Sequence, residues 1–131
     1  RAFLESSTLP SWFVHKLLDC RFVAHTNTTL TTDGLFSVNE SPTGMCGCLG
    51  TLDQRTCSGA YWTACYPELD AKELHLFTLR QGEAGNPSHD LGSGEFKLER
   101  AGASWPDLAA AYIIQFHRHF LRTGDRAFLE T

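Results

Sequence analysis

The chain has 131 residues, of which 42% are hydrophobic and 20% are charged, and these proportions are typical of a folded domain rather than a disordered chain. The longest apolar run, residues 108–114, is shorter than the roughly 18 residues that a membrane-spanning helix needs. The formal charge is −4, and the 11 basic residues are scattered along the chain. Because nucleic acid is bound by a stripe of positive charge, the sequence argues against a nucleic-acid partner.

The cysteines are Cys20, Cys46, Cys48, Cys57 and Cys65. Their number is odd, and their density is too low for a disulfide-stapled scaffold. Residues 1–5 lack the apolar segment of a secretory signal, so we expect a cytoplasmic setting with the cysteines buried as small hydrophobic residues. The spacing of Cys46 and Cys48 differs from that of common zinc modules. We therefore expect no metal ion and no cofactor, with a structural metal or a Cys–His pair as the weaker alternatives.

Three predicted elements fill the first half of the chain. Residues 9–25 carry apolar side chains at the spacing of one helical face and predict a helix. Residues 28–38 hold two β-prone runs on either side of Asp33 and Gly34, and this pattern predicts a β-hairpin. Residues 39–59 are rich in glycine and are expected to form a loop.

Helices and a long loop are expected next. Residues 60–66 predict a short helix, and a better marked helix is expected over residues 70–80. In this second helix Asp70 is placed to cap the first turn, and Glu73 stands at the capping-box position. Residues 82–102 form a polar run with five glycines, and so long a loop is usually functional or disordered.

The last strong prediction is a helix over residues 105–122, which follows a capping sequence. Residues 108–114 are apolar on nearly all sides, so we expect this helix to be well buried. Gly124 suits the position just after the last turn, and Asp125 is placed to cap a following helix.

The pentapeptide Arg-Ala-Phe-Leu-Glu occurs twice, at residues 1–5 and again at residues 126–130. The second copy opens a helix of barely two turns, which is too short to be stable alone. The repeat predicts that the chain is a piece of a longer array of helical pairs, with coincidence as the alternative explanation.

Carboxylates near the predicted hairpin are the first candidates for chemistry. Glu40 ends a strand and enters a glycine-rich stretch, and Asp53 follows thirteen residues later. Two carboxylates held together on loops can bind a polar substrate, and one of them can act as nucleophile or general base. The alternative is structural: Glu40 is then a surface residue, and Asp53 pairs with Arg55.

Other candidates lie in the second half of the chain. His89 and its neighbour Asp90 fall in the long loop, where the histidine can donate a hydrogen bond to a substrate hydroxyl or can simply be exposed. The aromatic residues near predicted helices are explained best by core packing, with stacking against a sugar ring as the alternative. They are Trp12, Tyr61, Trp62, Tyr66 and Trp105.

Several short motifs together carry a resemblance to a known family. They are, in chain order, Asp33-Gly34-Leu35-Phe36, Glu40, Gly50-Thr51-Leu52-Asp53, Tyr66-Pro67-Glu68-Leu69, His89-Asp90-Leu91-Gly92, Trp105-Pro106-Asp107-Leu108, Thr123-Gly124-Asp125 and Phe128-Leu129. In this order and at this spacing they resemble the catalytic region of the non-lysosomal glucosylceramidases, glycoside hydrolase family 116. The resemblance covers nearly the whole chain, and it is carried by the ordered set because no single motif is highly specific.

The resemblance implies a mainly α fold, in which residues 1–131 are a single partial domain from the N-terminal part of an (α/α)6 barrel. It also implies retaining hydrolysis of β-glucosides or related glycosides. Glu40 falls at the position of the family's nucleophile. Asp53, His89 and Asp90 fall where the family binds the sugar.

Two departures from the family pattern shape the functional expectation. The stretch after Glu40 diverges from the family, and residues 51–53 read Thr-Leu-Asp where the family has Thr-Tyr-Asp. The family's acid/base aspartate would lie beyond this chain, so we expect the isolated chain to be inactive on glycosides. The alternative is a non-enzymatic helical domain for carbohydrate binding or scaffolding. In either case, self-association through uncovered helical faces stays open.

Overall fold

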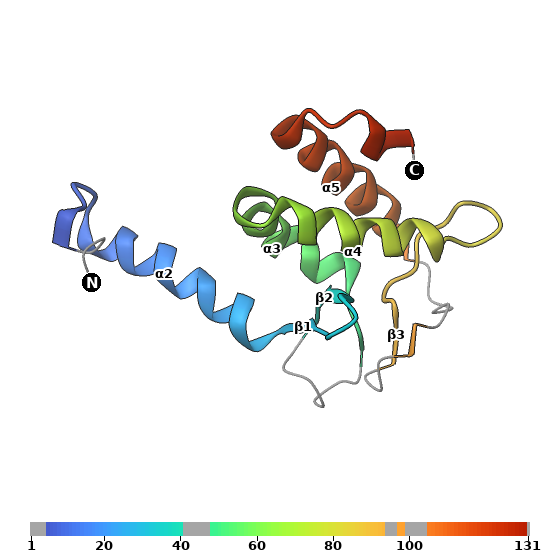
Figure 1. Cartoon of the computed structure of the whole chain (residues 1–131), viewed down its shortest axis with the longest axis horizontal. Helices are drawn as coiled ribbons and strands as arrows, with labels where there is room; N and C mark the ends of the chain where they lie inside the picture. Colours follow the sequence, from blue (N-terminus) through green and yellow to red (C-terminus); the bar gives the residue numbers. More distant parts are fainter. Residues whose placement is uncertain (1–4, 41–47, 94–96, 99–104, 131) are drawn as a thin grey trace.

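The computed structural model describes residues 5–40, 48–93, 97–98 and 105–130. It is mainly helical, as predicted. The elements are α2 (Ser11–Thr26), β1 (Thr28–Leu30), β2 (Phe36–Val38), α3 (Leu52–Cys65), α4 (Pro67–Leu79), β3 (Gly92–Ser93), β4 (Lys97–Leu98), α5 (Leu108–Thr123) and the 3₁₀ helix η1 (Ala127–Glu130). Figure 1 shows α3, α4 and α5 packed together, with α2 extending away from them.

The predicted hairpin is confirmed. Strands β1 and β2 pair antiparallel, with Thr28 opposite Val38 and Leu30 opposite Phe36. The turn is closed by a bond from Gly34 N to Thr31 O (3.0 Å), at the Asp-Gly pair that signals it in the sequence. All three residues of β2 are buried, so this short strand lies inside the structure although it belongs to a two-stranded sheet.

Helix α2 confirms the helix predicted over residues 9–25, but it is poorly covered. Trp12 is 67% exposed and Phe22 is 70% exposed. The helix joins the core near its end, where Ala24 packs in a cluster with Phe36 and Trp62. The prediction that the aromatic residues are core residues is therefore right for Trp62 and wrong for Trp12.

Helix α3 contains the short helix predicted over residues 60–66 but begins earlier, so the prediction of a loop over residues 39–59 is wrong for residues 52–59. It begins at Leu52, whose side chain is fully buried, and it continues through Gly59. Two arginine side chains lie over this glycine: a Cβ at Gly59 would be 3.1 Å from Arg118 Nη1 and 3.6 Å from Arg55 Nη1. The glycine that signals a loop in the sequence therefore lies inside a helix, with the flexible end of Arg118 close to it.

Helix α4 begins at Pro67, three residues before the predicted start. Proline suits the first turn because its missing N–H has no helical partner there. Asp70 and Glu73 do not cap the helix as predicted, because both are fully buried and bind Arg55.

Helix α5 confirms the strong C-terminal helix, but its predicted burial on nearly all sides is wrong. A single stripe is buried, and Ile113 on the other side is 66% exposed, because α3 and α4 cover only one face. The helix ends as predicted at Gly124, whose φ of +69° favours glycine and whose N–H donates to Phe120 O (2.8 Å). Asp125 then caps η1 through its bond to Phe128 N (3.3 Å).

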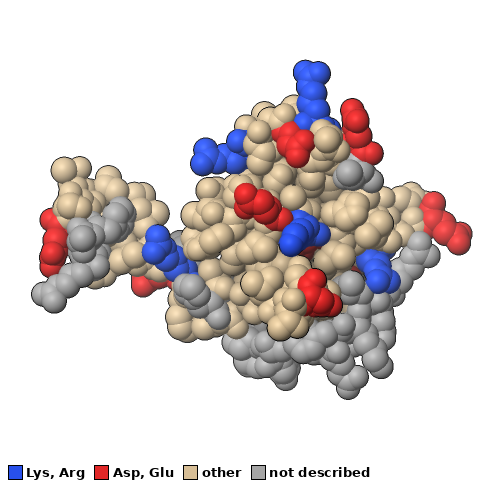
Figure 2. Space-filling view, viewed as in Figure 1, with Lys and Arg blue, Asp and Glu red and all other residues tan. Residues whose placement is uncertain are grey.

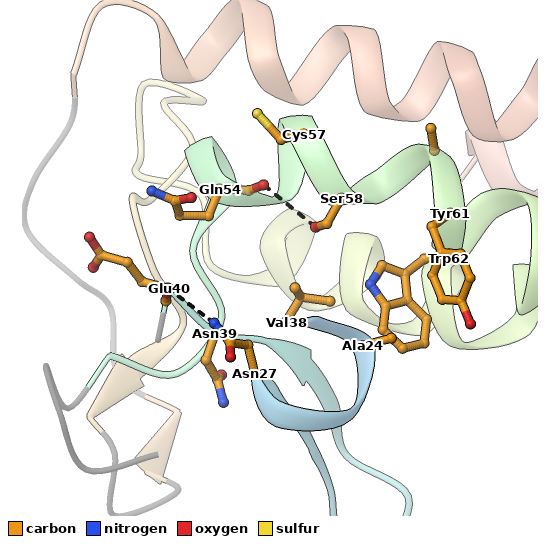
Figure 3. A pocket seen from close by; sticks show the side chains of 11 residues that line it. Ala24, Asn27, Val38, Asn39, Glu40, Gln54, Cys57, Ser58, Tyr61 and Trp62 are labelled. Carbon is orange, nitrogen blue, oxygen red and sulfur yellow. Dashed lines mark hydrogen bonds between the residues drawn. The ribbon is translucent and has the colours of Figure 1, made fainter. Parts of the chain in front are cut away.

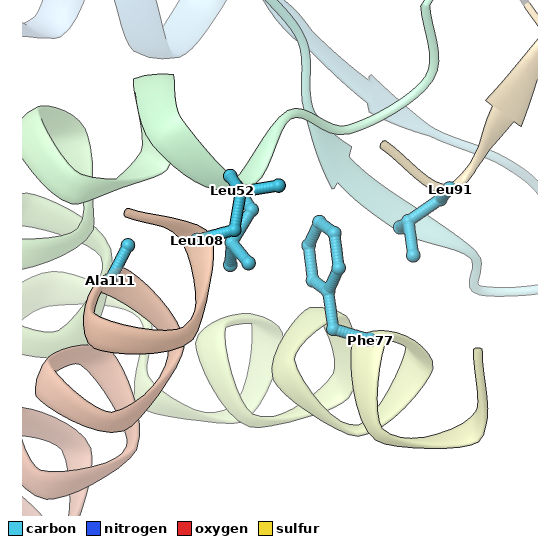
Figure 4. Packing of buried hydrophobic residues seen from close by; sticks show 5 residues of the cluster. All are labelled: Leu52, Phe77, Leu91, Leu108 and Ala111. Atoms are coloured by element: carbon cyan, nitrogen blue, oxygen red, sulfur yellow. The ribbon is translucent and has the colours of Figure 1, made fainter. Parts of the chain in front are cut away.

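The main hydrophobic core lies where these helices meet. Figure 4 shows Leu52, Phe77, Leu91, Leu108 and Ala111 pointing toward one another from α3, α4, α5 and the segment before β3. That segment belongs to the predicted loop over 82–102, which contains the pairing of β3 with β4. Residues 94–96 and 99–102 of the predicted loop lie outside the described residues.

Two features of the surface bear on the classes of partner. Figure 2 shows acidic and basic side chains interspersed on the face in view, rather than gathered by sign. Among the described residues, no helix combines the length and the apolar character needed to cross a membrane.

Candidate functional site

Three segments that are distant in the sequence meet at Thr51, the residue before α3. Thr51 N donates to Val38 O of β2 (3.1 Å), and Leu52 N donates to His89 O (2.8 Å). Thr51 also forms a β-bridge with Asp90. We call this arrangement of residues 38–39, 49–52 and 89–92 the Thr51 junction. Because adjacent extended segments lie about 4.8 Å apart, the junction brings the backbones of the predicted site residues together.

Glu40 leaves the junction at the end of β2, and its side chain is exposed. It lies at one end of a hollow of about 470 Å³, beside Gln54 of α3. Figure 3 shows Tyr61 and Trp62 at the other end of this hollow. The described residues that line it do not include Asp53, His89 or Asp90.

Asp53, His89 and Asp90 form a cluster of their own. The ring of His89 lies between the two carboxylates, with Nε2 3.2 Å from Asp53 Oδ1 and Nδ1 3.0 Å from Asp90 Oδ2. Asp90 is held in turn, because its other oxygen accepts a hydrogen bond from Gly92 N (3.0 Å). The structural alternative that pairs Asp53 with Arg55 is wrong, since Arg55 is engaged elsewhere.

The cluster is partly open to solvent. The Asp53 side chain is 27% exposed, and the ring of His89 packs against Trp105 at a centroid distance of 4.3 Å. Trp105 itself is 46% exposed, so its prediction as a core residue is wrong. An imidazole, a carboxylate and an accessible indole can together bind a polar ring that has an apolar face.

A second group of polar residues is buried between α3, α4 and α5, and it was not predicted. Arg55 Nε donates to Glu73 Oε2 (2.5 Å), Nη1 donates to Gln115 Oε1 (2.8 Å), and Nη2 bonds the Asp70 carboxylate. His119 Nδ1 lies 2.6 Å from the other Asp70 oxygen. We call Arg55, Asp70, Glu73, Gln115 and His119 the Arg55 network.

Burial and neighbouring charges shift the pKa values of Arg55 and Glu73 in the Arg55 network. Burial alone would lower the pKa of Arg55, but the charges of Glu73 and Asp70 and their hydrogen bonds raise it, so the guanidinium stays charged. Burial raises the pKa of Glu73, although Arg55 and the Val38 N–H act in the opposite direction. The network joins the helices to the junction, because Glu73 Oε1 accepts a hydrogen bond from Val38 N (2.5 Å).

The sequence does contain a signal for this network. Asp70, Glu73, Leu74 and Phe77 follow the i, i+3, i+4, i+7 spacing of one buried helical face, and two of these four positions are acidic. The buried face of α5 also contains polar residues, namely Gln115 and His119. Polar residues on an otherwise apolar face indicate a buried hydrogen-bonded group, but the spacing does not name their partners.

The described cysteines do not all follow the prediction that they are buried. Cys57 and Cys65 are exposed free thiols, so the prediction of buried cysteines is wrong for both. Cys46 lies outside the described residues, as does the divergent stretch over residues 41–45. Within the described part of the chain, no three histidine, cysteine or acidic side chains gather in a way that could hold a metal ion.

No family model matches the chain, and no curated protein matches it either.

Proposed function

We propose that this chain is part of the catalytic domain of a retaining β-glycosidase that acts on β-glucosides or related glycosides. In this proposal Glu40 is the nucleophile, Asp53 and Trp105 bind the sugar, and His89 lies between Asp53 and Asp90 and positions the Asp53 carboxylate. The proposal extends to the fold: the helical hairpins belong to an (α/α)6 barrel, of which residues 1–131 form a part.

One observation carries the proposal. Asp53 and His89 are 36 residues apart in the sequence, yet their side chains meet at 3.2 Å beside an exposed tryptophan. The Thr51 junction links this cluster to β2, at whose end Glu40 stands with an exposed carboxylate. A carboxylate and a polar cluster suited to sugar hydroxyls thus leave the same junction, and this supports the proposal.

The chemistry follows from these roles. The Glu40 carboxylate attacks the anomeric carbon, the bond to the leaving oxygen breaks, and a glycosyl ester forms on Glu40. A second carboxylic acid, which we place outside this chain, protonates the leaving oxygen. It then removes a proton from the water that hydrolyses the ester. Asp53 accepts hydrogen bonds from sugar hydroxyls, and the face of Trp105 packs against the C–H groups of the ring.

The test uses a substrate that needs no general acid. With 2-deoxy-2-fluoro-β-glucosyl fluoride, the leaving group departs as fluoride ion, and the fluorine at C2 slows hydrolysis of the glycosyl ester. We expect one 2-fluoroglucosyl group per chain, located on Glu40 by peptide mass spectrometry. Ordinary β-glucosides should show no turnover with the same sample.

The controls separate attack by Glu40 from chemical modification of accessible carboxylates. Glu40→Gln should abolish labelling, whereas Glu68→Gln, at an exposed position of α4, should leave it unchanged. Asp53→Asn should raise the reagent concentration that gives half-maximal labelling. The labelled residue should still be Glu40. Labelling on another residue, or on none, would refute the assignment of Glu40. Saturable glucose binding without labelling would favour the carbohydrate-binding alternative.

A further inference from the structure

Asn39, the residue before Glu40, uses its side chain in three hydrogen bonds. Its side chain is buried, with 3% of the residue exposed. The Oδ1 atom accepts bonds from Ser37 Oγ (3.0 Å) and Gly50 N (2.9 Å), and Nδ2 donates to Thr29 Oγ1 (3.0 Å). One amide thus ties β2 to β1 on one side and to the segment before α3 on the other.

The bond to Gly50 completes the Thr51 junction. Thr51 N donates to Val38 O on the β2 backbone, and the N–H of the preceding residue, Gly50, donates to the side-chain oxygen of Asn39. Gly50 has a φ of +60°, and a Cβ there would lie 2.9 Å from Leu91 Cδ1, so only glycine fits this close approach. Gly50 is therefore packed closely against Leu91, and its N–H donates to the Asn39 amide oxygen from this position.

The backbone around Asn39 is anchored as well. Asn39 N donates to Asn27 O (2.7 Å), and Val38 N donates to the buried Glu73 carboxylate (2.5 Å). At Glu40, Asn27 Nδ2 donates to the backbone carbonyl (3.4 Å), and the side chain is exposed (Figure 3). The backbone from which the Glu40 side chain leaves β2 is consequently held by the anchored Asn39 and by the bond from Asn27.

We propose that Asn39 is a positioning residue, whose amide fixes the backbone from which the Glu40 carboxylate reaches the anomeric carbon. This inference rests on the proposed function of Glu40. Asn39 does not take part in the chemical step, because its acceptor oxygen is already engaged by two donors. Its effect is on the geometry of attack, and a nucleophile displaced by about 1 Å can lose about 100-fold in rate.

The first measurement does not depend on catalysis. Amide hydrogen exchange, followed by NMR on the folded chain, compares the wild type with Asn39→Leu, Asn39→Ser and Asn39→Asp. Loss of the acceptor should speed exchange at Gly50 about tenfold in the leucine and serine variants. The aspartate variant keeps an acceptor and should retain protection. The amide of Gly124, at the end of α5, serves as the internal reference.

The second measurement is labelling by 2-deoxy-2-fluoro-β-glucosyl fluoride. We expect Asn39→Ser to lower the maximal labelling rate about 100-fold while leaving the half-saturating concentration within about twofold. Asn39→Asp should restore most of the rate. Phe128→Leu is the matched control, because it perturbs a buried residue of η1 outside the junction and should not change labelling.

The outcomes distinguish the two proposals. Unchanged exchange at Gly50 in the serine variant, or faster exchange with a normal rate of labelling at Glu40, would overturn the positioning role and leave the nucleophile in place. A wild-type chain that is never labelled at Glu40 would overturn the proposed function and this role with it. If Asn39→Leu does not fold, the serine and aspartate variants decide the question.

Discussion

Replacing Arg55 by methionine is the most direct test of the buried Arg55 network. The substitution keeps a long side chain but removes the guanidinium, which is fully buried and donates to Glu73, Gln115 and Asp70. Two carboxylates then remain buried without their counter-ion. Such a loss is more costly than deleting an exposed pair, because water cannot replace the lost partner.

The size of the effect can be worked out from the contacts. Removing one partner of a buried ion pair lowers the free energy of unfolding by about 3–5 kcal/mol. The lower part of this range applies here, because Glu73 can take up a proton and His119 remains beside Asp70. We therefore expect a loss of about 3–4 kcal/mol in the free energy of unfolding. For a chain of this size, the midpoint of thermal unfolding should fall by roughly 10–20 °C.

Thermal and urea unfolding, followed by circular dichroism, measure this loss. Arg118→Met is the matched control, since Arg118 is only half-buried and bonds Thr56 O at 3.4 Å, and it should cost less than about 1 kcal/mol. Combining Arg55→Met with Asp70→Asn and Glu73→Gln removes the stranded charges and should recover most of the stability. An Arg55→Met variant within about 1 kcal/mol of wild type would refute the reasoning, as would a triple variant no more stable than the single one.

Two further predictions concern neighbouring positions. Burial raises the pKa of Glu73 above its ordinary value of 4.5, so its contribution to stability is complete below that pH and is lost as the pH rises through the folded-state pKa. The unfolding midpoint of Glu73→Gln should therefore rise relative to that of the wild type as the pH increases above 4.5. A difference between the two midpoints that does not change with pH would contradict this. Gly59→Ala should stabilise α3 by about 0.5 kcal/mol, because its nearest obstacle is the movable end of Arg118; a loss measured by urea unfolding would show that Arg118 cannot move.

Local signals in the sequence account for the elements that were predicted well. The Asp33-Gly34 turn, the helix over residues 9–25 and the end of α5 at Gly124 each depend on residues within a few positions of one another. Backbone preference and apolar periodicity act at this range, so they can be read without the tertiary structure. The sequence also brought Glu40, Asp53, His89 and Asp90 into consideration as one candidate site.

Only the tertiary structure decided which partners these residues have. Asp53 meets His89 across 36 residues, and Arg55 meets Gln115 across 60, so no local pattern could choose between Arg55 and His89 as the partner of Asp53. The cost of burying Arg55 is offset only when α4 and α5 supply their acceptors together, and that condition belongs to the folded chain as a whole.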